Sequence, residues 1–158
     1  MRIVNSHDAE DTHRQNGQGD DAMKRILVID DDAAVRATFA MILSAQGYLI
    51  ETADGGEAGL AAADRARPDL VFLDLKMAGM NGVETLKRLS AAHADVPVYV
   101  VTAFYSEFME PLRNLKSTGI RFDIARKPLE MAEIRAIADS VLTGSAQKRS
   151  IALVGAGP

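Results

Sequence analysis

The sequence predicts an α/β fold in which five β-α units build a doubly wound parallel sheet with helices on both faces. Short apolar runs alternate with helix-like stretches along the chain, a pattern typical of buried parallel strands with right-handed crossover helices. In addition, four of these runs end in a polar residue. Because parallel strands all point the same way, we expect those polar residues to meet at one edge of the sheet.

The elements follow from hydrophobic periodicity and from turn residues. We predict strands over residues 25–29, 48–53, 69–73, 98–101 and 121–125, and helices over residues 33–45, 56–66, about 83–92, a short stretch ending at 116, and 130–142. Gly47 stands where a helix C-terminal cap belongs, Pro68 prevents a helix from continuing into the third strand, and Gly119 separates the fourth helix from the fifth strand. Asp32 is expected to cap the first helix.

The fourth unit is less regular than the others. Pro111 would remove a hydrogen bond inside a helix but is favourable at the first helical position. We therefore expect the fourth helix to begin near Pro111. Phe104, Tyr105 and Phe108 would then lie in an extended loop above Thr102, with Phe122 close by.

Length and composition define the class of protein. The chain has 158 residues, enough for one domain, and no cysteine, which excludes thiolate catalysis, zinc-thiolate sites and disulfides. Its net charge of -4 argues against direct binding to nucleic acid or to an anionic membrane. Neither a signal peptide nor a membrane span is recognisable, so a cytoplasmic protein is expected. We divide the chain into a disordered arm (1–23), one domain (24–143) and a tail (144–158).

The polar residues at the strand ends suggest phosphoryl chemistry. Asp30 and Asp31 follow the first strand and Asp74 the third, and three close carboxylates repel one another unless a cation such as Mg²⁺ lies between them. Thr102 ends the fourth strand and Lys127 follows the fifth. A hydroxyl and an ammonium at these positions can bind the oxygens of a phosphoryl group, and aspartate is a known phosphoryl acceptor.

Together these motifs resemble the receiver domain of two-component response regulators, over about residues 24–143. The matching segments are Ile26 to Asp32, Asp74-Leu-Lys-Met-Ala-Gly-Met-Asn-Gly82, Val101-Thr-Ala103 and Lys127-Pro128. The resemblance implies a flavodoxin-like (βα)₅ sheet with strand order 2-1-3-4-5. It also implies that Asp74 accepts the phosphoryl group, that Thr102 is the switch hydroxyl and that Lys127 pairs with the phosphoryl group. Asp30, Asp31, Asp74 and the backbone carbonyl of Lys76 would bind Mg²⁺, and the Lys127-Pro128 peptide would be cis.

The resemblance further implies a stand-alone signalling domain rather than an enzyme, with at most self-phosphorylation from small donors and slow self-dephosphorylation. The donor would be a histidine kinase or a histidine phosphotransfer protein. The downstream protein target is unknown, and the sequence leaves open whether the chain forms a homodimer. A surface around the fourth helix, the fifth strand and the fifth helix is the expected regulated face.

Three departures from the family pattern affect these expectations. Ala78 replaces the usual proline in the loop after Asp74, and Ile124 replaces the usual aromatic residue that reads out activation. The third departure is the aromatic-rich segment 103–118, which is longer than in typical receivers and contains Pro111, and it is our candidate for that readout. Lys76 and Phe104 lie two residues beyond Asp74 and Thr102, where a long cation and a bulky ring would shield an acyl phosphate from water.

Two other functions fit parts of the pattern. The first is a receiver-like binding module that works without phosphorylation, which the unusual fourth-helix region favours and the full set of site residues opposes. The second is a metal-dependent phosphatase of similar topology, which usually needs a second carboxylate two residues after the nucleophile, where this chain has Lys76. Taken singly, each site residue also has an ordinary structural explanation as a turn, strand or surface residue.

Overall fold

The structure is a computed structural model that describes residues 22–143. The strands are β1 (Arg25–Ile29), β2 (Leu49–Ala53), β3 (Leu70–Leu73), β4 (Val98–Thr102) and β5 (Asp123–Arg126). The helices are α1 (Ala33–Ala45), α2 (Gly56–Arg65), α3 (Gly82–Ala92), α4 (Tyr105–Ser117) and α5 (Met131–Leu142). The tail expected over 144–158 and residues 1–21 of the expected arm lie outside the described residues, so the division of the chain into arm, domain and tail stays a prediction.

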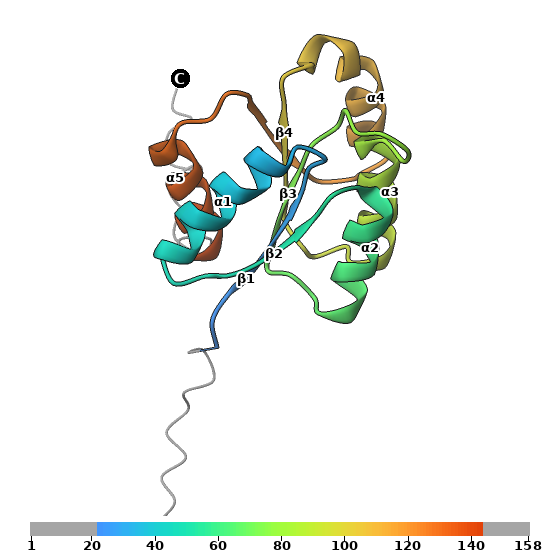
Figure 1. The fold of residues 1–158 in the computed structure, drawn as a ribbon. Helices are drawn as coiled ribbons and strands as arrows, with labels where there is room; N and C mark the ends of the chain where they lie inside the picture. Colours follow the sequence, from blue (N-terminus) through green and yellow to red (C-terminus); the bar gives the residue numbers. More distant parts are fainter. Residues whose placement is uncertain (1–21, 144–158) are drawn as a thin grey trace, which may run out of the picture.

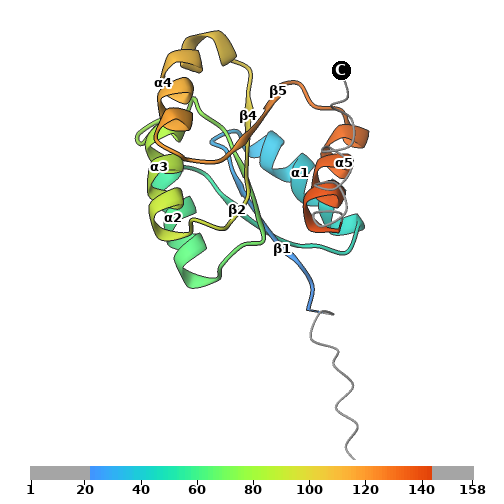
Figure 2. The same cartoon turned by 180° about the vertical axis from the view of Figure 1, so that it is seen from behind.

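The strands form one parallel sheet in the order β2-β1-β3-β4-β5, which confirms the predicted fold. The helices α1 and α5 cover one face of the sheet, and α2, α3 and α4 cover the other (Figures 1 and 2). Among residues 22–143, no helix is long and apolar enough to cross a membrane.

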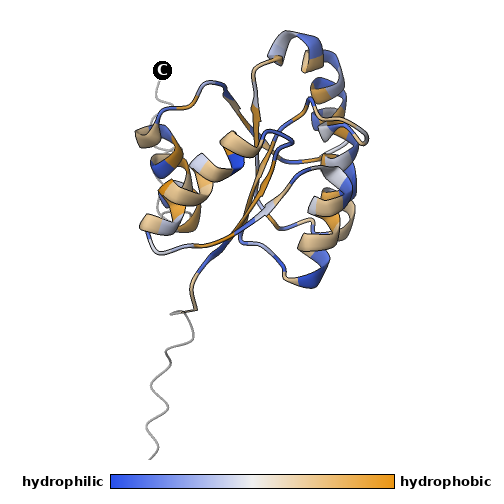
Figure 3. Cartoon of the chain, viewed as in Figure 1, coloured by the Kyte–Doolittle hydropathy of each residue, from blue (hydrophilic) through white to orange (hydrophobic). Residues whose placement is uncertain are grey.

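The core has two halves, one on each face of the sheet, because side chains alternate along every strand. Leu27 and Ile29 of β1 pack into the half that α2, α3 and α4 cover. Ile26 and Val28 pack into the half beneath α1 and α5. Figure 3 shows the apolar central strands between the two helical layers. With both faces buried, only the ends of the strands remain for polar chemistry.

Local sequence signals set the ends of the first helix as expected. The carboxylate of Asp32 accepts hydrogen bonds from the backbone N–H groups of Ala34 and Val35, so α1 begins at Ala33, four residues after the end of β1 at Ile29. Gly47 follows the helix with φ of 90°, a left-handed conformation that glycine adopts without steric penalty. The chain therefore turns sharply at both ends of α1, and Asp30 is held at the edge of the sheet.

The prediction for the fourth helix was wrong. The helix α4 begins at Tyr105 and contains Pro111 in its interior, whereas we expected an extended loop followed by a helix that starts near Pro111. The backbone carbonyl of Phe104 accepts hydrogen bonds from the N–H groups of Glu107 and Phe108, which closes the first turn. Phe108 packs partly buried against the core, and this tertiary contact outweighs the unfavourable proline.

Two further differences concern the same region. Figure 1 shows the first turns of α4 running across the end of the molecule before the helix turns along the sheet, a bend of the kind that an internal proline causes. Phe122 is buried just before β5 begins, at the end of the sheet opposite Thr102. The expectation that it lies close to Phe104 and Tyr105 was therefore wrong.

Candidate functional site

The site lies at the C-terminal ends of the central strands, where sheet hydrogen bonds align the residues that follow each strand. The N–H of Asp30 donates to the carbonyl of Ala53 at 3.1 Å, and the N–H of Asp74 donates to the carbonyl of Ile29 at 2.9 Å. The N–H of Lys127 donates to the carbonyl of Thr102 at 3.0 Å. The sheet itself thus brings the predicted site residues together.

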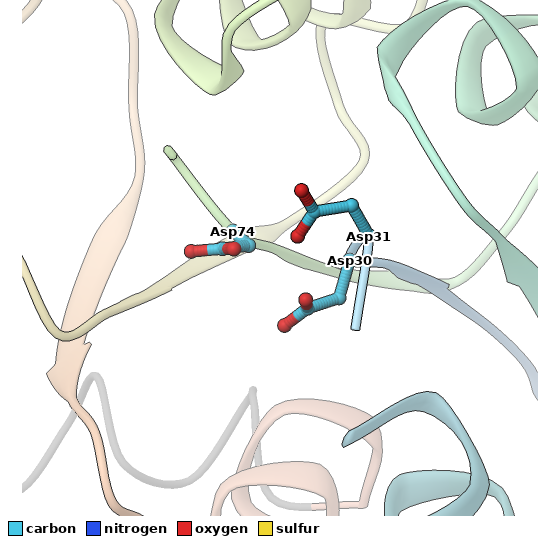
Figure 4. Close-up of side chains that lie close together, drawn as sticks. All are labelled: Asp30, Asp31 and Asp74. Carbon is cyan, nitrogen blue, oxygen red and sulfur yellow. The ribbon is translucent and has the colours of Figure 1, made fainter. Parts of the chain in front are cut away.

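Three carboxylates converge at this edge (Figure 4). Asp30, Asp31 and Asp74 each offer one oxygen, and these oxygens lie within 4.8 Å of one another. Asp30 and Asp74 are buried, whereas Asp31 is exposed. The Asp31 carboxylate also accepts a 3.4 Å hydrogen bond from the N–H of Ala78, which a proline at that position could not donate. We call these three residues the acid pocket.

Lys127 neutralises part of this negative charge. Its Nζ donates to Oδ2 of Asp30 at 2.7 Å and lies 3.6 Å from Oδ2 of Asp74. Its side chain is 21% exposed, so water screens these ion pairs only in part. The Lys127-Pro128 peptide is cis, as the resemblance implies.

Asp30 is fixed by further contacts. Oδ1 of Asp30 accepts a hydrogen bond from the N–H of Asp32 at 2.9 Å, and the guanidinium of Arg36 donates to the Asp30 carbonyl at 2.8 Å. Arg36 is a contact of the site that was not predicted from the sequence. It is the only charged residue of α1, and a lone cation on an otherwise uncharged helix was the signal that marked it.

Asp74 is in an environment that disfavours its charged form. Burial, followed by the negative charge of Asp30, raises the pKa of the Asp74 carboxyl from 3.8 to about 6. The positive charge of Lys127 and hydrogen bonds from the backbone N–H groups of Leu75 and Lys76 act in the opposite direction. The N–H of Leu75 donates to Oδ1 at 2.9 Å. Asp74 is thus an oriented carboxylate with little solvation, which a nearby cation would stabilise.

Thr102 and Lys76 complete the predicted set. Thr102 is fully buried, and its hydroxyl oxygen accepts a 3.0 Å hydrogen bond from the N–H of Phe104. The side chain of Lys76 contacts the ring of Phe104, at 4.0 Å, and the carboxylate of Glu107, at 3.4 Å. Glu107 was not predicted from the sequence, because one exposed glutamate in a helix carries no distinguishing signal. The role of the Lys76 carbonyl as a metal ligand stays a prediction.

The donor set of the acid pocket fits a hard divalent cation. All three side chains present carboxylate oxygens, the ligands that Mg²⁺ prefers, and one of them is open to solvent. Asp30 and Asp74 are two buried carboxylates that repel each other when both are ionised, and the single positive charge of Lys127 neutralises only part of their negative charge. The residues present therefore fit the group that the resemblance implies.

Comparisons with known proteins agree with this geometry. The response regulator receiver domain family matches residues 26–139. Sporulation initiation phosphotransferase F of Bacillus subtilis (strain 168) is 34% identical over 112 residues, which cover 71% of this chain and 88% of that protein. Regulatory protein AtoC of Escherichia coli (strain K12) is 29% identical over 130 residues, 82% of this chain but only 28% of that protein.

A solved structure leads to the same family. The chemotaxis protein CheY4 of Vibrio cholerae matches with a TM-score of 0.67 and 29% identity, over 77% of this chain and all of that one. The fold and the strand order agree with the match. The chain therefore belongs to the receiver domain family of two-component response regulators.

Proposed function

We propose that this receiver accepts a phosphoryl group from a phosphohistidine onto Asp74, in the presence of Mg²⁺, and thereby changes its interactions with other proteins or passes the phosphoryl group along a relay. The observation that carries the proposal is the position of the Lys127 ammonium, which lies 3.6 Å from the buried Asp74 carboxylate and 2.7 Å from that of Asp30, beside the three converging carboxylates. If the domain had only a structural role, three carboxylates would not need to converge beside this lysine.

The reaction follows from the orientation of these groups. Oδ1 of Asp74 is held by the N–H of Leu75, which leaves Oδ2, the oxygen facing Lys127, as the nucleophile. This oxygen forms the new bond to phosphorus while the bond from phosphorus to the donor imidazole breaks, and the imidazole leaves with the electron pair. The Lys127 ammonium then pairs with a phosphoryl oxygen.

Thr102 supplies the second contact to the phosphoryl group. Its hydroxyl oxygen accepts from Phe104, so its own proton is free to donate. We infer that the hydroxyl turns toward the phosphoryl group and in doing so weakens its bond to Phe104, at the start of α4. Phosphorylation would thereby be linked to the segment 103–118. This segment is our candidate for the readout of activation, because Ile124 stands where the family usually has the aromatic residue that serves this role.

Asp30, Asp31, Asp74 and the Lys76 carbonyl would bind Mg²⁺. Bound there, the ion would neutralise charge on the carboxylates and on the phosphoryl oxygens. Asp31 is the solvent-exposed member of the acid pocket and the one through which an ion would enter.

The proposal extends to partners and location. The donor would be a histidine kinase or a histidine phosphotransfer protein, and the regulated face would be built from α4, β5 and α5. Acting as a phosphoacceptor rather than as an enzyme, the domain would turn over only its own acyl phosphate, and slowly. A cytoplasmic location is part of the same proposal, and so is the absence of direct contacts with nucleic acid or membrane.

The test is the intact mass of the protein after incubation with acetyl phosphate and Mg²⁺. We expect a gain of one phosphoryl group in the wild type and in Asp95→Asn, an exposed carboxylate far from the site, but none in Asp74→Asn. No gain together with no Mg²⁺ binding would favour the phosphorylation-independent module. A gain that persists in Asp74→Asn would contradict the assignment of the acceptor.

A further inference from the structure

A cavity of about 260 Å³ opens between α1 and the segment that leads from β5 into α5. Its floor is buried and apolar, and consists of Phe39, Val101 and Ile134. Its rim is exposed, and includes Ala34, Thr38 and Pro128. Lys127 is the only charged residue that lines the cavity, and its ammonium is already paired with Asp30. Pockets for small molecules usually measure about 300–1,000 Å³ and hold several placed polar groups, so this cavity is better suited to one or two aliphatic side chains.

The cavity lies at one end of the seam between α1 and α5, which lie side by side on the same face of the sheet (Figures 1 and 2). Asp139 lies at the other end of this seam. Its exposed carboxylate accepts a 2.7 Å hydrogen bond from the hydroxyl of Tyr48, which follows α1. On α1, Ala34, Thr38 and Met41 share one face because of their helical spacing, and Met41 is 63% exposed. An uncharged strip of α1 therefore extends along the seam from the cavity.

The chain that follows α5 carries complementary residues in the matching order. Counted forward from Thr143, the last residue that the structure describes, the sequence has a basic pair, Lys148-Arg149, and then an apolar run, Ile151-Ala-Leu-Val154. Counted backward along α5 from the same residue, the surface presents the carboxylate of Asp139 and then the cavity beside Ile134. Five residues of helix, about 7.5 Å, separate these two features, and two residues of extended chain, about 7 Å, separate the basic pair from the apolar run.

The tail is long enough to return to the cavity. Thr143 lies nine residues beyond Ile134 along α5, a distance of about 14 Å. The chain from Thr143 to Ile151 spans up to about 26 Å when it is extended. The apolar residues Ile3 and Val4 of the N-terminal arm are joined to the domain by a longer segment, and closing a longer loop costs more entropy. The tail is therefore the favoured occupant within this chain.

We propose that residues 151–154 dock in the cavity between α1 and α5, with Lys148-Arg149 beside Asp139. Ile151 and Leu153 supply the two aliphatic side chains, because alternate residues of an extended segment point the same way. Burial of these side chains is the main gain, and a single exposed ion pair adds little. Since Lys127 lines the cavity, the docked tail covers the surface next to the acid pocket, and any other ligand of the cavity must displace it.

The test uses the absence of cysteine from the chain. In Thr38→Cys/Ala152→Cys, one thiol lies at the rim of the cavity and the other in the tail, and the rate of disulfide formation in oxidised glutathione reports how often they meet. The matched control is Ala45→Cys/Ala152→Cys. Ala45 is exposed at the other end of α1, next to Gln46, which contacts Asp139 and so lies closer to the end of α5. A tail that moves freely would react at least as fast in this control.

We expect the pair at the cavity to close about tenfold faster than the control pair, because docking raises the effective concentration of the tail thiol there. Leu153→Asp should bring that rate down to the rate of the control, since a carboxylate is costly to bury in an apolar cavity. Ala156→Asp, beyond the apolar run, should leave it unchanged. Mass spectrometry of mixed ¹⁵N-labelled and unlabelled protein distinguishes bonds within one chain from bonds between two chains.

A second measurement needs no cysteine. The methyl NMR signals of Val101 and Ile134, on the floor of the cavity, should shift between the wild type and Leu153→Asp but not between the wild type and Ala156→Asp. Circular dichroism confirms that each variant is folded. The proposal is overturned if the pair at the cavity closes no faster than the control, if Leu153→Asp changes neither the rate nor the methyl signals, or if the disulfides form only between chains, which would assign the cavity to a second copy.

Discussion

Replacing Asp74 by asparagine should stabilise the metal-free protein, although it removes the proposed phosphoacceptor. Burial and the charge of Asp30 raise the pKa of Asp74 from 3.8 to about 6, which corresponds to roughly 3 kcal/mol of unfavourable free energy for the charged form, at about 1.4 kcal/mol per pKa unit. Because dissolved ions and water reduce part of this electrostatic penalty, we expect the free energy of unfolding of Asp74→Asn to exceed that of the wild type by about 1–3 kcal/mol at pH 7 in EDTA. For a domain of this size that is roughly 4–12 °C in Tm.

The pH dependence of this gain has a definite sign. The folded-state pKa of Asp74 lies above its unfolded value, so protonation favours the folded wild type, and this contribution is complete below pH 4 and lost as pH rises through 6. The advantage of Asp74→Asn should therefore be full above pH 6 and vanish toward pH 4. Thermal unfolding of both proteins, followed by circular dichroism at several pH values, measures the difference.

Mg²⁺ and a second variant complete the design. A ligand at ten times its Kd stabilises the folded state by about 1.4 kcal/mol, so saturating Mg²⁺ should narrow the gap between wild type and Asp74→Asn. Asp31→Asn is the matched control: its carboxylate is exposed, so it should gain little stability in EDTA, yet it should also lose the response to Mg²⁺. If Asp74→Asn is no more stable than the wild type in EDTA, or keeps its advantage at pH 4, the account of the acid pocket is wrong.

Three further predictions concern other parts of the molecule. In Gly82→Ala the new Cβ would lie 2.3 Å from the backbone carbonyl oxygen of Asp74, so a loss of about 1–3 kcal/mol or more is expected on denaturant unfolding, whereas Gly55→Ala, with open space around its Cβ, should be nearly neutral. Tyr48→Phe loses a 2.7 Å hydrogen bond to Asp139 and should cost about 1 kcal/mol at pH 8. The Tyr48 pKa is raised to about 12, so this contribution is present below pH 10 and lost as pH rises toward 12, which alkaline unfolding curves of the two proteins would show. In Phe104→Ala the ring beneath Lys76 is gone, and phosphoryl label should leave the protein faster than from the wild type; an equal or slower loss would refute the shielding role.

The fold was predictable because its central strands, β1, β3 and β4, are largely buried on both faces. Runs such as Ile26 to Ile29 leave little alternative to a central parallel strand, and once the strands are parallel, Asp30 and Asp74 must follow them at the same edge. Asp32 and Gly47 also acted as their local chemistry predicts, since capping depends on neighbouring residues alone.

The fourth helix was not predictable by the same means. Pro111 argued locally for a late start, but packing of Phe108 against the core and the contact between Tyr105 and Arg126 hold the earlier turns in place. The bridge from Lys76 to Glu107 joins segments 31 residues apart in sequence, and no local pattern carries such a contact. Long-range side-chain pairs of this kind become visible only when the fold places them side by side.

The central claim is that Asp74 carries the phosphoryl group, and chemical trapping tests it most directly. Borohydride reduces an aspartyl phosphate to homoserine, so wild-type protein incubated with a phosphorylated histidine phosphotransfer protein and Mg²⁺, then reduced and digested, reports the acceptor by peptide mass. The account predicts homoserine at position 74 and at no other aspartate. Homoserine at position 30 or 31, or none at position 74 after confirmed transfer from the donor, would contradict it.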